Sequence, residues 1–423
     1  MENKQLYDEI EEIRLLTHYT NRNKKKIKKR KKIGAPKGHI GYARSIPKKI
    51  DSIKEVILEN CPICSDRITG KVIGVRSRHI TNIKPILKSR TTQYNIPRKY
   101  CTKCKKIVEP ILANALPHSL LGINLMYIVV YLRLGLSLSW GKINDYIKHI
   151  YNVKMTNAAL ITFLKRIAHH NEEVYNQILL KLIKRKVIYA DETRWPIHGV
   201  KWWVWIFSSE SECVYILSDK RDHKVPCSLL NDYKGILVCD FYSAYEKVKC
   251  KQQKCLVHVL RDFQRALKKA PYDEELKIFI EDFLKIFEPI FKKLREPDTD
   301  YTQIKTKKKI VKKRIKELLK KEYISKEVNK FKKRFTKHLE SMIRFLNNPE
   351  KISWNNNQAE RDLRPLCIQR KISGSLQSEK VSNDYLLLFS IYQTCEKRQI
   401  NFLKFLQSKR NNIPKRVSIK LKK

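Results

Sequence analysis

Residues Val187–Phe207 read V-I-Y-A-D-E-T-R-W-P-I-H-G-V-K-W-W-V-W-I-F, and this stretch decides the fold. It opens with an apolar run that ends in the acid Asp191, and a His-Gly pair then precedes a second run rich in Trp, Val, Ile and Phe. Two β-branched or aromatic runs around such a turn predict a β-hairpin. A third run, Cys213–Leu217, is expected to extend the hairpin into a meander. An acid at the exit of a buried strand is held by rigid backbone, which suits metal binding, although many strands end in an ordinary aspartate.

Two further acids occupy comparable positions downstream. The run I-L-V-C-D is an apolar strand that ends in Asp240, and K-C-L-V-H-V-L-R-D-F after it is interpreted as a further strand entering a helix. In S-W-N-N-N-Q-A-E-R, Asn355 or Asn356 caps a helix, and Glu360 lies one turn inside it. Adjacent strands of a mixed sheet would bring Asp191 and Asp240 together, and a helix that crosses the sheet would add Glu360.

Three carboxylates in one place are hard oxygen ligands of the kind that Mg²⁺ and Mn²⁺ prefer. Two such ions can activate an attacking water or 3′-hydroxyl and stabilise the leaving oxygen of an in-line displacement. The residue pattern therefore indicates a nuclease-like metal site, without establishing that the three acids converge. Glu192 directly follows Asp191 and would point to the opposite face of a continuing strand, so it is not assigned to the metal.

Composition indicates a polyanionic partner. The chain has 423 residues, enough for two or three domains with sizeable cores, and its 90 Lys and Arg against 42 Asp and Glu give a formal net charge of +48. Nucleic acid is the leading partner for such a charge, and a membrane surface is the alternative. The long apolar stretch Leu120–Leu138 contains Asn124, Arg133 and two glycines, which favours a buried helix over a membrane span. Residues Met1–Leu16 lack the apolar segment of a signal peptide, so a cytoplasmic protein is expected.

The N-terminal part of the chain is expected to form two small units. Residues 1–58 are interpreted as a basic arm, because residues 21–50 carry thirteen Lys or Arg and no acid. Bound to DNA, such an arm would add salt-dependent, sequence-independent affinity, although a solvated linker has the same composition. Residues 59–117 hold two C-x-x-C pairs, which predict one structural zinc ion in a small ribbon, with unmetallated thiols as the alternative. The four cysteines are Cys61, Cys64, Cys101 and Cys104.

Residues 118–186 have a helical pattern. Within them, Trp140–Ile150 and Thr156–His170 are predicted helices separated by a turn, and Thr156 is the predicted N-cap of the second. The pair is either a helix-turn-helix that reads a DNA groove or two core helices, and the pattern favours neither.

The C-terminal half is also predominantly helical. Residues 263–350 keep apolar positions at helical intervals even through their most basic part, so ordered helices with a basic outer face are expected. Pro365 is expected to bend the helix that carries Glu360, and residues 369–375 are expected to form a loop. A final helix precedes a basic tail, residues 406–423.

Four motifs together indicate a family. Y-A-D-E-T with W-W-V-W, V-C-D-F-Y-S-A-Y, C-L-V-H-V-L-R, and N-N-x-x-E-R-x-L-R-P followed by R-K and Gly resemble the transposases of the insertion sequence 66 family. The resemblance also includes the four-cysteine segment and the helix that follows it. It implies an α/β chain with a ribonuclease H-like catalytic core of the retroviral-integrase type at residues 187–405. This core would contain a large helical insertion at about 263–350, and the zinc ribbon and the helical region would precede it.

The resemblance also implies a chemistry. Asp191, Asp240 and Glu360 would be the catalytic DDE acids and would hold two Mg²⁺ or Mn²⁺ ions. The implied activity is metal-dependent DNA strand cleavage at the ends of an insertion sequence, followed by transfer of the 3′-hydroxyl into target DNA. The implied assembly is a homo-oligomer on DNA, associated with the nucleoid and with no membrane partner. The residues expected to contact DNA are Arg361, Arg364, Arg370 and Lys371.

Two other classes of function are compatible with the same residues. One is a DNA-binding protein whose nuclease-like core is non-catalytic, and the other is a structure-selective nuclease that cuts DNA without joining it. Cys255, His258 and Arg261 also fit the family pattern. Because two soft ligands are too few for a zinc site, these residues are expected to be structural or to face DNA.

Overall fold

The computed structural model describes residues 91–93, 95, 99–101, 106–108, 115–116, 119, 121–294, 296, 298–373 and 378–414. The predicted basic arm, the C-terminal tail beyond Pro414 and three of the four C-x-x-C cysteines lie outside these residues. Of the predicted zinc ribbon, the structure describes the backbone of two antiparallel strands, β1 (Lys99–Cys101) and β2 (Lys106–Val108).

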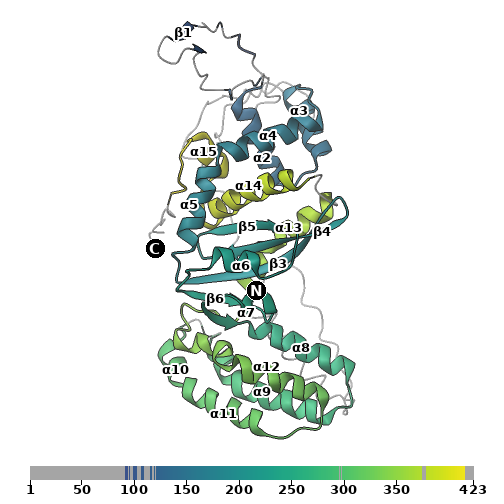
Figure 1. Cartoon of the computed structure of the whole chain (residues 1–423), viewed down its shortest axis with the longest axis vertical. Coiled ribbons are helices and arrows are strands. Elements are labelled where there is room, and N and C mark those ends of the chain that lie inside the picture. The colour runs from purple at the N-terminus through teal and green to yellow at the C-terminus, as the bar shows by residue number, and fades with distance from the viewer. Residues whose placement is uncertain are drawn as a thin grey trace, which may run out of the picture. The chain divides into compact units, whose positions relative to one another are not determined.

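A mixed five-stranded sheet in the order β5-β4-β3-β6-β7 forms the centre of the fold (Figure 1). The predicted meander is confirmed: β3 (Val187–Ile197), β4 (Val200–Ser208) and β5 (Cys213–Ser218) pair antiparallel. His198 and Gly199 between β3 and β4 have φ of 47° and 79°, which is the backbone that a two-residue hairpin turn requires. β6 (Ile236–Cys239) and β7 (Lys251–Lys254) add to the other side of β3 in parallel. This α/β arrangement is compatible with a ribonuclease H-like fold.

The position of β7 differs from the sequence prediction. The expected strand at K-C-L-V is wrong, because the strand is the preceding K-Q-Q-K segment and Cys255 is already the N-cap residue of α8 (Leu256–Lys269). No apolar pattern marks this strand, since hydrogen bonds compensate the burial of its polar side chains. Gln253, for example, is fully buried and its Nε2 donates to the carbonyls of Lys254 and Met342 at 2.7 and 3.1 Å. Two short helices, α6 (Lys224–Leu229) and α7 (Ser243–Glu246), connect the strands.

One set of helices shares a hydrophobic core with the sheet. It comprises α2 (Ile123–Leu134), α3 (Trp140–Tyr151), α4 (Asn157–His170), α5 (Glu172–Leu182), α14 (Glu379–Lys397) and α15 (Phe402–Gln407). The N-cap prediction is confirmed, because the side chain of Thr156 accepts a hydrogen bond from the backbone N–H of Ala159. Among the described residues, no helix is long and apolar enough to cross a membrane.

The helix that carries Glu360, α13 (Asn357–Ser373), packs against β3 and β4. The expected loop is wrong for residues 369–373, which continue this helix despite Pro365 inside it. Proline removes one backbone hydrogen bond and disfavours a helix locally. Here tertiary packing outweighs that penalty: Leu366 and Gln369 are fully buried, and the buried Arg133 of α2 donates to the Ser373 hydroxyl at 2.8 Å.

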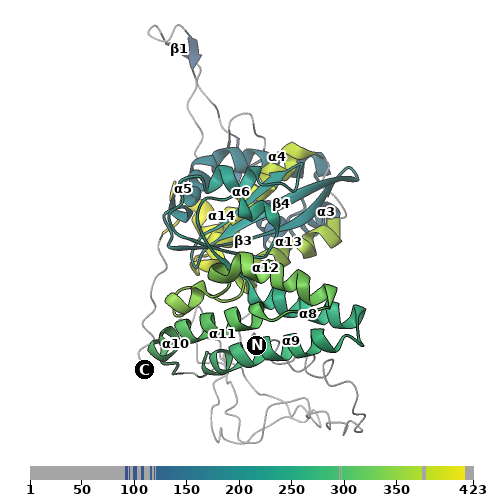
Figure 2. The ribbon, with the colours of Figure 1, turned by 60° about the horizontal axis from the view of Figure 1, so that its bottom comes forward.

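A second hydrophobic core lies beyond the β6–β7 side of the sheet (Figures 1 and 2). As the helical pattern predicts, residues 256–347 form α8, α9 (Glu274–Lys293), α10 (Tyr301–Thr306), α11 (Lys308–Lys320), α12 (Lys326–Met342) and the 3₁₀ helix η1 (Arg344–Asn347). Phe263 of α8 is at the centre, with four phenylalanines edge-on to its ring: Phe279, Phe283, Phe331 and Phe335. Such pairs each add about 0.5–1.5 kcal/mol beyond burial, so this basic region is an ordered body.

Candidate active site

Asp191 and Asp240 lie side by side in the sheet. The parallel strands β3 and β6 pair Val187 with Ile236 and continue in step to Tyr189 and Val238. Continuing this register by two residues places Asp191 beside Asp240, which directly follows β6. Neighbouring strands are about 4.8 Å apart, so the backbones of the two acids are close enough for their side chains to share a metal ion.

Glu360 approaches the same point from α13. Thr193, which shares a face of β3 with Asp191, lies 3.8 Å from the Cys367 sulfur of α13, so Asp191 faces that helix. Burial raises the pKa of Asp191 well above its usual value, and the neighbouring carboxylates of Glu192, Asp240 and Glu360 raise it further. A backbone hydrogen bond from Glu192 opposes part of this rise. Asp240 and Glu360 therefore both lie near enough to Asp191 to repel its carboxylate.

Asn356 connects the segments that carry these acids. Its fully buried side chain donates from Nδ2 to the carbonyl of Ala190, the residue before Asp191, at 2.8 Å. Its backbone N–H donates to the Cys255 sulfur at 3.2 Å, and its carbonyl accepts from the N–H of Glu360 at 3.2 Å. One residue thus joins β3, the start of α8 and the first turn of α13.

Lys254 holds the backbone of Asp240 in place. Its side chain is completely buried at the end of β7, and Nζ donates to the main-chain carbonyl of Asp240 at 2.8 Å. The ammonium group also lies 3.5 Å from the Cys239 sulfur. A buried cation beside a group of acids reduces their mutual repulsion, and no apolar pattern in the sequence marks this lysine as a core residue.

Glu192 lies on the opposite face of β3 and has partners of its own. Tyr245 donates to its carboxylate at 2.6 Å, and Arg221 forms an ion pair with it at 2.5 Å. The Arg221 guanidinium in turn stacks on the rings of Trp203 and Tyr242, at 4.9 and 4.1 Å from their centroids. Burial raises the pKa of Glu192, while its hydrogen bonds to Tyr245 and Arg221 lower it.

Glu360 also belongs to a second group of possible ligands. The ligand atoms of Cys255, His258 and Glu360 all lie within 4.8 Å of one another. Arg261 donates to both carboxylate oxygens of Glu360 at 3.2 Å, and His258 Nδ1 lies 3.8 Å from one of them. Burial raises the pKa of Cys255 to about 12, so the thiol is protonated without a metal. The sequence analysis missed this group because it considered only Cys255 and His258, and Glu360 is 105 positions from Cys255. The C-x-x-H spacing at the start of a helix was the signal that could have indicated it.

The four predicted DNA-contacting residues all lie on α13 but differ in exposure. Arg361, Arg364 and Lys371 are exposed. Arg370 is half-buried and donates to the Thr193 hydroxyl and the Arg194 carbonyl, so at least part of its role is to attach α13 to β3.

The expected strand exit at Asp191 is wrong, because β3 continues past it to Ile197, whereas Asp240 does follow the end of β6. A mixed sheet with two acids on neighbouring strands, and a third acid supplied by a helix, defines a candidate nucleic-acid-processing enzyme. The profile of the family described as "Transposase IS66 family" matches residues 118–383, which is more than half of the chain. The chain therefore belongs to the IS66 family of transposases. No curated protein matches it. Membership in a transposase family implies DNA binding and agrees with the use of a divalent metal.

Proposed function

We propose that this chain is a DDE transposase that cleaves DNA strands at the ends of its element and transfers the freed 3′-hydroxyl into target DNA. Family membership supports a transposase. The observation that carries the catalytic assignment is the register between β3 and β6, which places Asp191 beside Asp240 when it is continued by two residues. The repulsion that Glu360 exerts on Asp191 supports the third acid.

The chemistry of these side chains fits a divalent cation. All three offer carboxylate oxygens, the ligands that Mg²⁺ and Mn²⁺ prefer. The raised pKa of Asp191 reflects burial and repulsion by neighbouring carboxylates, and a dication is the natural counter-charge for such a cluster. When bound, two ions would activate the attacking water or 3′-hydroxyl and stabilise the leaving oxygen.

The protein's part is to position the acids. Asp191 lies within β3 and Asp240 directly follows β6, and Asn356 and Lys254 anchor the backbone beside these two acids. Glu360 is held by Arg261, so its carboxylate is already oriented before any ligand arrives. Positioned groups of this kind contribute to catalysis because they need not be reorganised during the reaction.

Other parts of the chain would serve DNA binding. Arg361, Arg364 and Lys371 are exposed on the helix of Glu360, where they can contact phosphates, with Arg370 beside them. We propose that α8–α12 are an insertion in a ribonuclease H-like core. These helices follow β7 and precede α13 along the chain, and they form a hydrophobic core of their own. The proposal further includes a zinc ribbon held by the four C-x-x-C cysteines, a helical region 118–186 that is either a helix-turn-helix or structural, and a homo-oligomer on DNA.

A cleavage and joining assay tests this function. The purified chain is incubated with Mg²⁺, a supercoiled plasmid and a labelled duplex that carries the DNA flanking the gene. The expected products are a nick that leaves a 3′-hydroxyl and a labelled strand joined to the plasmid. Cleavage with no joined product would instead indicate a structure-selective nuclease. Binding with no cleavage would indicate a DNA-binding protein with a non-catalytic core, and either result contradicts the proposal.

A further inference from the structure

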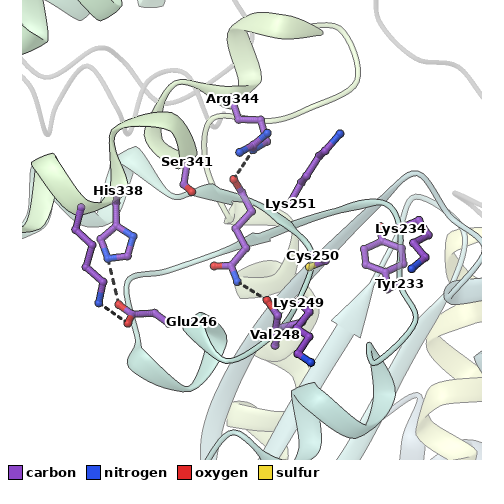
Figure 3. Close-up of a pocket in the computed structure, with 12 residues that line it drawn as sticks. Tyr233, Lys234, Glu246, Val248, Lys249, Cys250, Lys251, His338, Ser341 and Arg344 are labelled. Atoms are coloured by element: carbon purple, nitrogen blue, oxygen red, sulfur yellow. Dashed lines mark hydrogen bonds and ion pairs between the residues drawn. The ribbon is translucent and has the colours of Figure 1, made fainter.

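An open groove with a volume of about 670 Å³ runs along the outer edge of β7, between that strand, α7 and the end of α12 (Figure 3). β7 is the last strand of the sheet, and none of the residues assigned above to catalysis lines this groove. We call it the β7 groove.

The charge of the β7 groove is strongly positive. Lys234, Lys249 and Lys251 line it, are exposed, and make no ion pair within the described part of the chain. The one acid in the lining, Glu246, forms an ion pair with Lys337 at 2.6 Å and lies 3.1 Å from the His338 ring, which Figure 3 shows beside it. Three lysines therefore face solvent with no counter-charge of their own.

The walls of the β7 groove are held by internal hydrogen bonds. Arg344, labelled in Figure 3, donates from Nε to the Gln252 carbonyl at 2.8 Å. The Gln252 side chain donates to the carbonyls of Tyr245 and Val248. These bonds connect η1, β7 and α7, which are three separate elements around the groove. The groove is therefore formed before any ligand binds.

One end of the β7 groove reaches the proposed catalytic centre. The ring of His338, in the groove lining, contacts the ring of Phe241 edge-on with their centroids 5.6 Å apart, and Phe241 directly follows Asp240. At the other end, Lys251 pairs with Ile236 at the start of the parallel strands. Lys251 is three residues, or about 10 Å, from the strand end beside Asp240.

We propose that the β7 groove binds the sugar-phosphate backbone of duplex DNA and leads it toward Asp240. This inference rests on the proposed function, since it names the track of the DNA substrate. Continuing the register of β6 and β7 places Lys234 beside Lys249, so the three lysines without counter-charge gather at the start of these strands, where they can contact neighbouring phosphates of one DNA strand. The lining has two aromatic rings: Tyr233 is buried, and His338 packs against Phe241 and contacts Glu246, so neither offers an open platform for stacking unpaired bases. Contacts here hold the duplex without reading its sequence.

The test uses two triple variants of the full chain with equal charge change. The groove variant is Lys234→Gln/Lys249→Gln/Lys251→Gln. The control is Lys309→Gln/Lys316→Gln/Lys320→Gln, which removes three exposed lysines that share one face of α11. All six positions are exposed, so both proteins should fold, as checked by thermal melting.

The readout is the affinity for a duplex of arbitrary sequence over a range of salt concentrations, measured without divalent metal. Each lost phosphate contact lowers the slope of log K against log salt by about 0.9, so the groove variant should lose up to about 2.7 while the control keeps the wild-type slope. An unchanged slope in the groove variant, or an equal loss in both variants, overturns the inference. Tighter binding of wild type to an RNA duplex than to DNA of the same sequence overturns the choice of DNA.

The same two variants separate this inference from the proposed function. Because the slope is measured without metal, it does not depend on cleavage. A wild-type chain that never cleaves DNA but loses slope in the groove variant would refute the transposase mechanism and support the groove. A wild-type chain that cleaves and joins DNA while the groove variant keeps the wild-type slope would refute the groove alone.

Discussion

Substitution of Asn356 tests whether this residue positions the catalytic acids or only stabilises the fold. In Asn356→Ala, the buried carbonyl of Ala190 loses its 2.8 Å donor. Leaving a buried acceptor unsatisfied costs about 1–3 kcal/mol, and this loss should be seen in chemical denaturation. The same change frees the backbone that precedes Asp191 from the start of α13. A displacement of a catalytic group by about 1 Å can lower a rate by about 100-fold, so metal-dependent cleavage should fall by that order.

The neighbouring Asn355 supplies the matched control. Its side chain accepts from the N–H of Asn357 at 3.1 Å and from the Ser353 hydroxyl at 3.2 Å, so its hydrogen bonds stay at the start of α13. Asn355→Ala should cost about 1 kcal/mol, as other cap removals do, yet leave the cleavage rate near that of wild type. Equal cleavage rates in Asn355→Ala and Asn356→Ala, at the expected losses of stability, would refute a positioning role for Asn356.

Three further predictions concern the acids and cysteines. Without metal, burial and neighbouring carboxylates raise the pKa of Asp191, so the wild-type protein should lose stability as pH rises from the usual 3.8 towards the raised pKa. Thermal melts in chelator should therefore show that Asp191→Asn is more stable than wild type at neutral pH. The stability of this variant should also depend less on pH. Cd²⁺, which favours thiolate ligands, should bind Cys255, His258 and Glu360 and inhibit Mg²⁺-dependent cleavage; Cys255→Ser should resist, and equal inhibition of both proteins would exclude this site. Metal analysis should find one zinc per chain that is lost in Cys101→Ser/Cys104→Ser, and zinc unchanged in that variant would rule out the ribbon site.

Patterns of neighbouring residues in the sequence were enough to predict the hairpin at the centre of the sheet. The hairpin from Val187 to Phe207 was predictable because its β-branched and aromatic runs and the His-Gly turn between them all favour it. The adjacency of Asp191 and Asp240 was a plausible inference, because both end apolar runs that a mixed sheet can pair. Thr156 was predictable as an N-cap because capping depends on residues three positions apart.

The surroundings of the acids were not predictable, because they depend on long-range contacts. Arg261 and Glu360 are 99 residues apart, and Asn356 and Ala190 are 166 apart. Local periodicity contains no information on which distant residues meet. The polar strand β7 was misplaced because hydrogen bonds, not apolar side chains, compensate its burial. The continuation of α13 past Pro365 was missed for a related reason, since packing against the sheet outweighed a local penalty.

Metal-dependent cleavage by single-acid variants is the most direct test of the central claim. Asp191→Asn, Asp240→Asn and Glu360→Gln each keep the shape of the side chain and remove its charge. Each should abolish Mg²⁺-dependent cleavage of a labelled element end while binding that DNA as tightly as wild type, and double variants should be hardly worse than single ones because the acids act as a unit. The control Asp282→Asn removes a carboxylate of α9 that pairs with Lys321, and it should cleave normally. Cleavage at the wild-type rate by Glu360→Gln would contradict the account.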